Sequence, residues 1–539
     1  MLLVQDPLVI YGCLEERGMV VAEHIYDKQD LIVRLENARA KTLGEIDNKG
    51  IFEHVKQFER QKGIAGTIVE QCILGYDPDS DQAPDLIVVD GDSKTKTELK
   101  TTGMVIDTNP STHYVAKEPM SITAVGVYDI AEQEFFNSHF WEKLEHLLIV
   151  YYHYASKHAV SAGEYENFPV IGYEFHEFSD DDVSVLKNDW EYVRNLCKSV
   201  TDSFPGPKDA DWKARVKQKY IDVHGQLRSV LSFVDLAPKF PPRFRLKKPT
   251  VSAMIANHFG YSLEQLPGRY TTVSDIDAKC QELTVRYKGR TIESLAREFG
   301  IPYSRECENK GITEQIVVAM FGGTSKKLNQ IELFEKFGLI AKSIVVTPSG
   351  GRTEDMKLFK VDFSEIVQKS IEEDGFSREF TFEDSELYTY FADHALLCIM
   401  FEEAKSRVVE ESPGMFVEIP HKLGENKFLG FKRLVFSNKF IDEVVRPVWE
   451  DTRGKIINRT LVDVVQYRNG TAVINKSGDI SSAPNFIKSK DSTIFLRGSG
   501  TDSSLKHKTE CVNGIRMLPQ YVWMKGIAVI EELNKTSML

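Results

Sequence analysis

Residues 84–100 read PDLIVVDGDSKTKTELK, and the architecture of the first half of the chain depends on them. A run of four apolar, mostly β-branched residues ends at Asp-Gly, which is typical of a tight turn between two strands. Residues 95–102 then read as the return strand. If the turn is centred on residues 90–93, antiparallel pairing places Asp85 directly opposite Glu98, with their Cβ atoms about 5 Å apart. The stretch therefore predicts a β-hairpin that carries two neighbouring carboxylates.

The return strand also offers a lysine beside these acids. Glu98 and Lys100 are two residues apart and share one strand face, while Leu99 points into the core. Two carboxylates can share a hard cation such as Mg²⁺, and a nearby lysine can orient water and offset phosphoryl charge. Because Glu-x-Lys recurs elsewhere in the chain, the spacing alone favours solvated charges on an exposed strand.

A helical sequence motif precedes the hairpin and occurs twice in the chain. Residues 62–75 read KGIAGTIVEQCILG, with helical spacing that places Glu70 beside an apolar face. Residues 310–323 read KGITEQIVVAMFGG, in which Val318 stands where the first copy has Glu70. Further on, Ile340 occupies the position of Glu98. Taken alone, Glu70 is better explained as a solvated helix charge, but the loss of acids from one copy suggests one catalytic and one non-catalytic half.

Weaker matches follow in the same order in both halves. They pair residues 41–43 with 290–292, 138–141 with 385–388, 182 and 190 with 442 and 449, and 244–247 with 522–525. Gly and Pro interrupt the pattern near residues 260–272. We therefore expect two homologous domains, residues 1–262 and 263–539, each of mixed α/β structure.

Bulk composition predicts a folded protein without a membrane segment. The chain has 539 residues, 42% hydrophobic and 27% charged, and no apolar run approaches the roughly 18–20 residues that a bilayer requires. The start lacks the basic region of a secretory signal, and seven cysteines without a Cys-x-x-Cys pair read as reduced thiols. We expect a cytoplasmic protein. The net charge of −13 argues mildly against nucleic acid but leaves a local basic groove open.

The ordered set of motifs over residues 35–260 resembles the MutH branch of the PD-(D/E)xK nucleases. In addition to the helix and hairpin, it comprises a Ser-x-x-x-x-Lys-Leu segment at 138–144, Asp-Trp-Glu at 189–191, and Phe-x-Leu-Lys-Lys at 244–248 leading to His-Phe at 258–259. The resemblance implies a restriction-endonuclease-like fold, duplicated as two tandem MutH-like domains. The second copy resembles the inactive domain of two-domain restriction endonucleases of the Sau type, which cut at GATC.

Carried over by position, the resemblance implies a metal-binding and catalytic trio of Asp85, Glu98 and Lys100. Glu70 would be an additional acid near the metal, and Lys143 a supporting lysine. The spacing between Asp85 and Glu98 is longer than in the mismatch-repair member, so Asp90 competes for the role of first metal ligand.

The resemblance also implies DNA contacts. Lys208 lies in a Gly-Pro-Lys loop, and Arg245 occupies the position of a DNA-reading aromatic. A lysine or arginine in the major groove can donate to guanine O6 and N7. Lys247 reads as a phosphate contact or a surface charge. The counterparts in the second half are Arg497 in the loop, and Trp523 and Lys525 on the later strand.

These residues favour a Mg²⁺-dependent type II restriction endonuclease that cuts double-stranded DNA, with GATC as the expected site. We expect a monomer that can dimerise on DNA, whose second domain binds DNA and activates or positions the first. That domain could instead serve only packing or dimer contacts. Two other functions remain open, a mismatch-repair nickase and a DNA-binding protein without catalysis.

Overall fold

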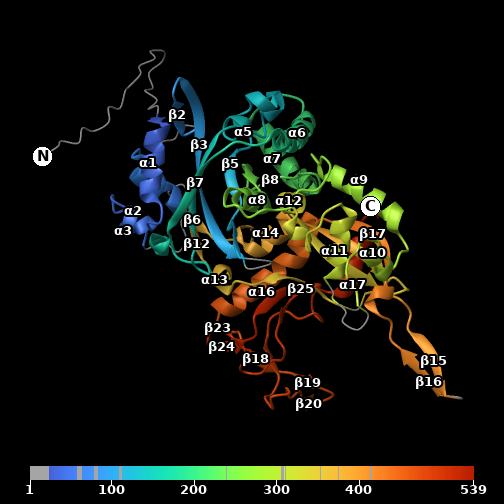
Figure 1. Ribbon diagram of the computed structural model, residues 1–539. Coiled ribbons are helices and arrows are strands. Elements are labelled where there is room, and N and C mark those ends of the chain that lie inside the picture. Colours follow the sequence, from blue (N-terminus) through green and yellow to red (C-terminus); the bar gives the residue numbers. More distant parts are fainter. Residues whose placement is uncertain are drawn as a thin grey trace.

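The computed structural model describes residues 24–56, 63–77, 83–107, 112–237, 239–304, 309, 311–352, 354–373, 376–412 and 415–539. Lys62 and Lys310, which open the two copies of the helix motif, lie outside these residues. Five cysteines within them are free thiols, Cys72, Cys197, Cys280, Cys398 and Cys511. No helix in the described part is both long and apolar enough to cross a membrane. The structure mixes helices with several sheets, as predicted (Figure 1).

The first half is built on a six-stranded sheet. Its strand order is β1-β2-β3-β6-β7, with β4 pairing to β3. The strands are β1 (Ile25–Asp27), β2 (Leu86–Asp90), β3 (Ser93–Asp107), β4 (His113–Ala116), β6 (Leu147–His153) and β7 (Val170–His176). The helices before β2 are α1 (Lys28–Ala38), α2 (Leu43–Ile46), α3 (Ile51–Val55), α4 (Ile64–Ile68) and the π-helical η1 (Val69–Leu74). The predicted hairpin is confirmed, since β2 and β3 are antiparallel with Asp90 opposite Ser93.

A second, three-stranded sheet lies in the same half, in the order β5-β9-β8. Its strands are β5 (Met120–Ala124), β8 (Val234–Leu236) and β9 (Arg243–Leu246). The associated helices are α5 (His139–Glu142), α6 (Asp180–Asp202), α7 (Ala210–Val223) and α8 (Lys248–His258). The connection from α8 to the next helix spans residues 260–272, where the sequence pattern was expected to break.

The second half contains two three-stranded sheets. One has the order β10-β14-β17 and the other β11-β25-β22. Their strands are β10 (Leu339–Val346), β11 (Met356–Lys360), β14 (Ala395–Glu402), β17 (Lys427–Leu434), β22 (Ile494–Gly498) and β25 (Gln520–Met524). β10 is parallel to β14 and β14 antiparallel to β17, just as β3 is parallel to β6 and β6 antiparallel to β7. β25 lies antiparallel between its neighbours, as β9 does.

Further helices and short strands complete this half. The helices are α9 (Val273–Tyr287), α10 (Ile292–Glu298), α11 (Ile312–Met320), α12 (Glu332–Lys336), α13 (Phe363–Ile366), α14 (Glu386–Asp393), α15 (Asn438–Phe440), α16 (Arg446–Ile457) and α17 (Gly526–Asn534). The short strands include β12 (Ser370–Glu373), β13 (Phe376–Glu379), β18 (Asp463–Val465), β19 (Tyr467–Arg468), β20 (Thr471–Ala472), β21 (Ser482–Pro484), β23 (Glu510–Val512) and β24 (Ile515–Met517). The hairpin of β15 (Arg407–Ser412) and β16 (Met415–Ile419) projects away from the body (Figure 1).

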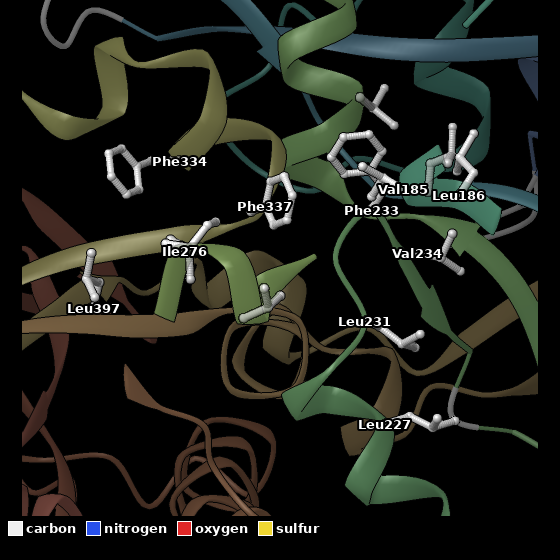
Figure 2. Close-up of a cluster of buried hydrophobic side chains, with 14 of the residues drawn as sticks. Val185, Leu186, Leu227, Leu231, Phe233, Val234, Ile276, Phe334, Phe337 and Leu397 are labelled. Atoms are coloured by element: carbon white, nitrogen blue, oxygen red, sulfur yellow. The ribbon is translucent and has the colours of Figure 1, made fainter. Parts of the chain in front are cut away.

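One hydrophobic cluster joins the two halves. It includes Leu186 and Phe233 from the first half and Ile276 and Phe337 from the second, all fully or nearly buried (Figure 2). The rings of Phe233 and Phe337 are 5.3 Å apart in an edge-to-face contact. Because apolar burial is the main stabilising term in folding, this shared core fixes the halves against each other.

Candidate active site

The hairpin brings two predicted carboxylates together. Leu86 pairs with Thr97, so one further step of the register places Asp85 opposite Glu98, as the sequence predicted. The backbone N–H of Leu99 donates to Asp85 Oδ2 at 2.9 Å. Asp90, the alternative ligand, lies at the turn end of the hairpin, where it pairs with Lys28 at 2.6 Å. The geometry therefore favours Asp85 over Asp90 as the partner of Glu98.

Two lysines bind Glu98, which is 2% exposed. Lys100 Nζ donates to Glu98 Oε1 at 2.6 Å, and Lys143 Nζ donates to Oε2 at 2.8 Å. Lys143 directly follows α5, and Ser138 caps this helix by accepting the backbone N–H of Trp141. A buried carboxylate is tolerated only when its charge is compensated and hydrogen-bonded, and the two ammonium groups meet both needs.

Asp85 is under electrostatic strain. Burial and the negative charge of Glu98 raise the pKa of Asp85, and the ammonium of Lys100 partly offsets the effect. Two like charges at neighbouring positions favour the binding of a cation, and oxygen ligands suit Mg²⁺. Within the described ranges, no group of three or more His, Cys, Asp and Glu side chains forms a metal cluster. Two carboxylates still fit Mg²⁺, which commonly keeps several waters and uses one or two carboxylates with substrate phosphates.

Glu70 approaches the same strand from the helix side. It lies in the π-helical segment that continues α4, one turn after Gly66. A Cβ atom at Gly66 would lie 3.7 Å from Thr101 Oγ1 and 4.0 Å from Glu70 Oε1, so the small residue leaves room between helix and strand. Helical spacing predicted the helix but not the π-turn, a feature often found at functional sites.

A cleft of about 450 Å³ opens in front of these charges. Glu98, Lys100 and Lys143 line it together with side chains of β5, β9 and α5. Sequence reasoning missed further polar residues that line the cleft, among them His139 and Arg243. Arg243 lies two positions before Arg245 in the strand identified from the sequence, so a broader reading of that strand would have included it. The cleft places Glu98 and its two lysines where a phosphodiester could enter.

Comparisons with known proteins agree with this arrangement. Residues 74–189 match the family model described as the DNA mismatch repair enzyme MutH, and the match includes Asp85, Glu98, Lys100 and Lys143. The type II restriction enzyme Sau3AI of Staphylococcus aureus is 21% identical over 512 residues, covering 91% of this chain and 93% of that enzyme. The two matches together support a MutH-like type II restriction endonuclease, a site-specific deoxyribonuclease.

The predicted DNA contacts of the endonuclease fall into two groups. The first group lies at or near the surface. Lys208 lies two residues after Gly206, whose φ of +138° is a backbone conformation that favours glycine. The side chain of Lys208 is 58% exposed. Arg497 lies 5.1 Å from the ring of Trp523, whose Nε1 donates to the Arg497 carbonyl, and Lys525 directly precedes α17. Arg497 lies within β22, not in a loop as predicted.

The second group, Lys247 and Arg245, is directed into the protein: Lys247 is 5% exposed and the Arg245 side chain 19%, an arrangement that differs from the predicted DNA contacts. Arg245 Nε donates to Asp235 Oδ1 at 3.0 Å, and its guanidinium also lies 3.7 Å from Asp393 in the other half. Lys247 Nζ donates to the Leu231 carbonyl at 2.7 Å. Both cations are directed into the protein because buried acceptors surround them, and neither is presented to DNA in this structure.

The positions that the sequence repeat matches to Glu70 and Glu98 hold no acids in the second half. Val318 is fully buried in α11, the counterpart of the helix that carries Glu70. Ile340 pairs with Leu396 on the parallel strand β14, as Glu98 pairs with Leu147 on β6. Lys342 is retained, but its Nζ donates to a backbone carbonyl at 3.1 Å.

Proposed function

We propose that the endonuclease hydrolyses double-stranded DNA in a Mg²⁺-dependent reaction at a short site, with GATC as the expected sequence. The observation that carries this proposal is the position of Glu98, opposite Asp85 and between two lysines on the wall of the cleft. Asp85, Glu98 and Lys100 are the proposed catalytic residues, supported by Glu70 and Lys143.

Each residue has a separate role in the proposed reaction. Asp85 and Glu98 would hold Mg²⁺, with Glu70 as a further acid nearby. The cation would supply Lewis-acid stabilisation of the phosphate oxygens. Lys100 lines the cleft and is placed to orient the attacking water and to offset the charge that develops on the phosphate. Lys143 is a positioning residue, because its bond to Oε2 fixes the orientation of Glu98.

We further propose that the halves, residues 1–262 and 263–539, are tandem MutH-like domains with divided roles. The repeated strand pairings and the shared order of motifs support this interpretation. The first domain would cut, and the second would bind DNA and position the first. Lys208 in the first domain, and Arg497, Trp523 and Lys525 in the second, are the proposed DNA contacts. The single set of acids per chain supports a monomer that dimerises on DNA to cut both strands.

The test is cleavage of plasmid DNA with Mg²⁺ by the wild type and by Glu98→Ala. We expect discrete linear fragments from the wild type and none from Glu98→Ala, while binding of a labelled duplex stays within about twofold. Glu177→Ala is the matched control, since Glu177 is 74% exposed and pairs with His146 outside the cleft. It should cut like the wild type. Plasmids that differ only in adenine or cytosine methylation, with the ends sequenced, would define the site.

The alternatives give different products. Nicked circles without linear DNA would indicate a mismatch-repair nickase. Tight, specific binding with no Mg²⁺-dependent cleavage would indicate a DNA-binding protein without catalysis. A smear of random fragments would contradict site-specific cleavage.

A further inference from the structure

A second cleft, of about 340 Å³, lies in the second half beside β21 and β22. Its lining is rich in polar side chains, including Gln466, Asn475, Ser481, Lys488, Arg497 and Gln520. Arg497 is a proposed DNA contact, but Lys488 and Gln520 have no role in the proposed function. Their surroundings indicate what the cleft binds.

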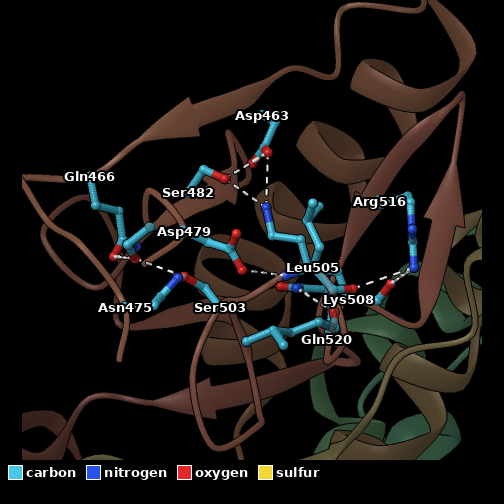
Figure 3. Close-up of polar contacts among 12 residues, drawn as sticks. Asp463, Gln466, Asn475, Asp479, Ser482, Ser503, Leu505, Lys508, Arg516 and Gln520 are labelled. Carbon is cyan, nitrogen blue, oxygen red and sulfur yellow. Dashed lines mark hydrogen bonds and ion pairs between the residues drawn. The ribbon is translucent and has the colours of Figure 1, made fainter. Parts of the chain in front are cut away.

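The polar wall of this cleft is held in place by its own hydrogen bonds (Figure 3). Ser481 Oγ donates to Gln466 Oε1 at 3.0 Å, and Asn475 Nδ2 donates to Ser503 Oγ at 3.2 Å. Behind them, the buried Lys508 pairs with Asp463 at 2.9 Å. A wall whose side chains are already bonded to one another needs little rearrangement to receive a ligand.

Lys488 brings an uncompensated positive charge to this wall. Its ammonium makes no hydrogen bond or ion pair with any residue that the structure describes, whereas the nearby cations Lys455 and Arg497 pair with carboxylates at 2.7 and 2.6 Å. The negative charge of Asp463 raises the pKa of Lys488, but Asp463 already forms an ion pair with Lys508. Burial, followed by the charges of Lys455 and Arg497, lowers the pKa of Lys488 to about 8. An anion in the cleft would relieve this repulsion.

Gln520 adds an unused acceptor. It is 1% exposed, its Nε2 donates to the Leu518 carbonyl at 2.8 Å, and its Oε1 has no donor among the described residues. It pairs with Gly498, where a Cβ atom would lie 3.1 Å from Gln520 Nε2, so the glycine allows this close packing. A buried acceptor without a donor costs about 1–3 kcal/mol, which a ligand N–H group would recover.

We propose that this cleft binds one nucleotide of the DNA held by the second half. Lys488 and Arg497 contact its phosphate, and Gln520 accepts a hydrogen bond from its base. Charge-assisted bonds to phosphate and an amide facing an amino group of a base are the chemistry that these side chains offer. The inference rests on the proposed DNA-binding role of the second half and names residues that carry it.

The test uses the full chain with Glu98→Ala, so that DNA stays intact, and compares Lys488→Met with Lys490→Met. Lys490 is exposed, lies two residues away and does not line the cleft, so it is the matched control. Binding of a labelled duplex that carries the site is measured over a range of salt at pH 7. Lys488→Met should weaken binding about tenfold and reduce the salt slope by about one, as expected for one lost phosphate contact. Lys490→Met should bind DNA like the parent protein, the full chain that carries Glu98→Ala alone.

A proton-linked measurement separates a specific contact from general loss of charge. At pH 8.5 part of the Lys488 population is neutral, and a phosphate would raise its pKa again, so DNA binding should take up protons. Calorimetry in buffers of different ionisation enthalpy should detect this uptake in the parent and in Lys490→Met but not in Lys488→Met.

The outcomes are distinguishable. If the parent does not bind DNA, the proposed function fails. If the parent binds and Lys488→Met has the same affinity, salt slope and proton uptake, only the present inference fails. Proton uptake with inorganic phosphate but not with DNA would assign the cleft to a free anion and would overturn it. Equal thermal melting of the two lysine variants verifies that folding does not cause the difference.

Discussion

At the residue scale, Asp85 and Glu98 are held in an arrangement that folding alone would not favour. Two carboxylates occupy opposite register positions, and two lysine ammonium groups together with the Leu99 backbone N–H offset their charge. Desolvating charged groups is costly even when they are paired. Strained electrostatics of this kind cluster at functional sites, because the repulsion is relieved when a cation or substrate binds.

Asp85→Asn should therefore separate activity from stability. Asparagine keeps an oxygen that can accept the Leu99 N–H bond but removes the repulsion with Glu98. We expect cleavage to fall at least about a hundredfold, the scale of removing one electrostatic group from an active site. The free energy of unfolding should stay equal or rise by up to about 1 kcal/mol. Plasmid cleavage and urea unfolding would check the two effects.

The stability of Asp85→Asn relative to the wild type should also depend on pH in a defined direction. Because burial and Glu98 raise the pKa of Asp85 in the folded protein, its contribution is favourable at low pH and is lost as pH rises through that pKa. Asp85→Asn lacks this titration, so its stability relative to the wild type should increase as pH rises above about 4. A relative loss of stability with rising pH would contradict the assignment.

At the element scale, two short helices provide a matched pair. Ser138 and Ser385 are buried, and each hydroxyl donates to the carbonyl three residues earlier at 2.6 Å. Each also accepts a backbone N–H three residues later, at 3.2 Å in α5 and 3.1 Å in α14. Only α5 leads to an active-site lysine, Lys143. The two caps are alike in structure but differ in their distance from the proposed chemistry.

Ser138→Ala and Ser385→Ala should therefore destabilise the protein equally but affect catalysis differently. Each loses a helix cap and a buried hydrogen bond, which costs about 1–2 kcal/mol. Ser138→Ala should also lower kcat about tenfold, because Lys143 no longer holds Glu98 firmly. Ser385→Ala should keep the wild-type kcat at saturating DNA. Equal losses of kcat in the two variants would show that α5 does not position Lys143.

Elements that depend on local pattern could be predicted from the sequence, and those that depend on tertiary packing could not. A short apolar, β-branched run and an Asp-Gly turn were enough to predict the hairpin and to place Asp85 opposite Glu98. The π-turn at Glu70 was missed because α- and π-segments have similar local spacing. Arg245 was assigned to DNA because it occupies the position of a DNA-reading aromatic in the family that the sequence resembles, but its side chain pairs with Asp235 on the neighbouring strand and with Asp393 in the other half.

At the scale of the whole molecule, this buried ion cluster couples the halves. Asp235 and Arg245 come from the first half, and Asp393 ends α14 in the second. Burial and the negative charge of Asp235 raise the pKa of Asp393 well above its usual range. Arg245 pairs with Asp235 and lies 3.7 Å from Asp393, so its guanidinium links side chains from both sides of the interface. β9, which carries Arg245, also contributes Arg243 and Phe244 to the active-site cleft.

Arg245→Met should consequently lower the stability of the fold rather than change DNA recognition directly. Removing the cation leaves two buried carboxylates facing each other, at a cost of about 3–5 kcal/mol. We expect a lower urea midpoint and faster proteolytic cutting between the halves, at residues 260–272. Arg243→Met is the control on the same strand, because Arg243 is exposed and its loss should leave the urea midpoint unchanged. If Arg245→Met instead kept full stability and only changed the choice of DNA site, Arg245 would be a DNA-reading residue, as its sequence position first indicated.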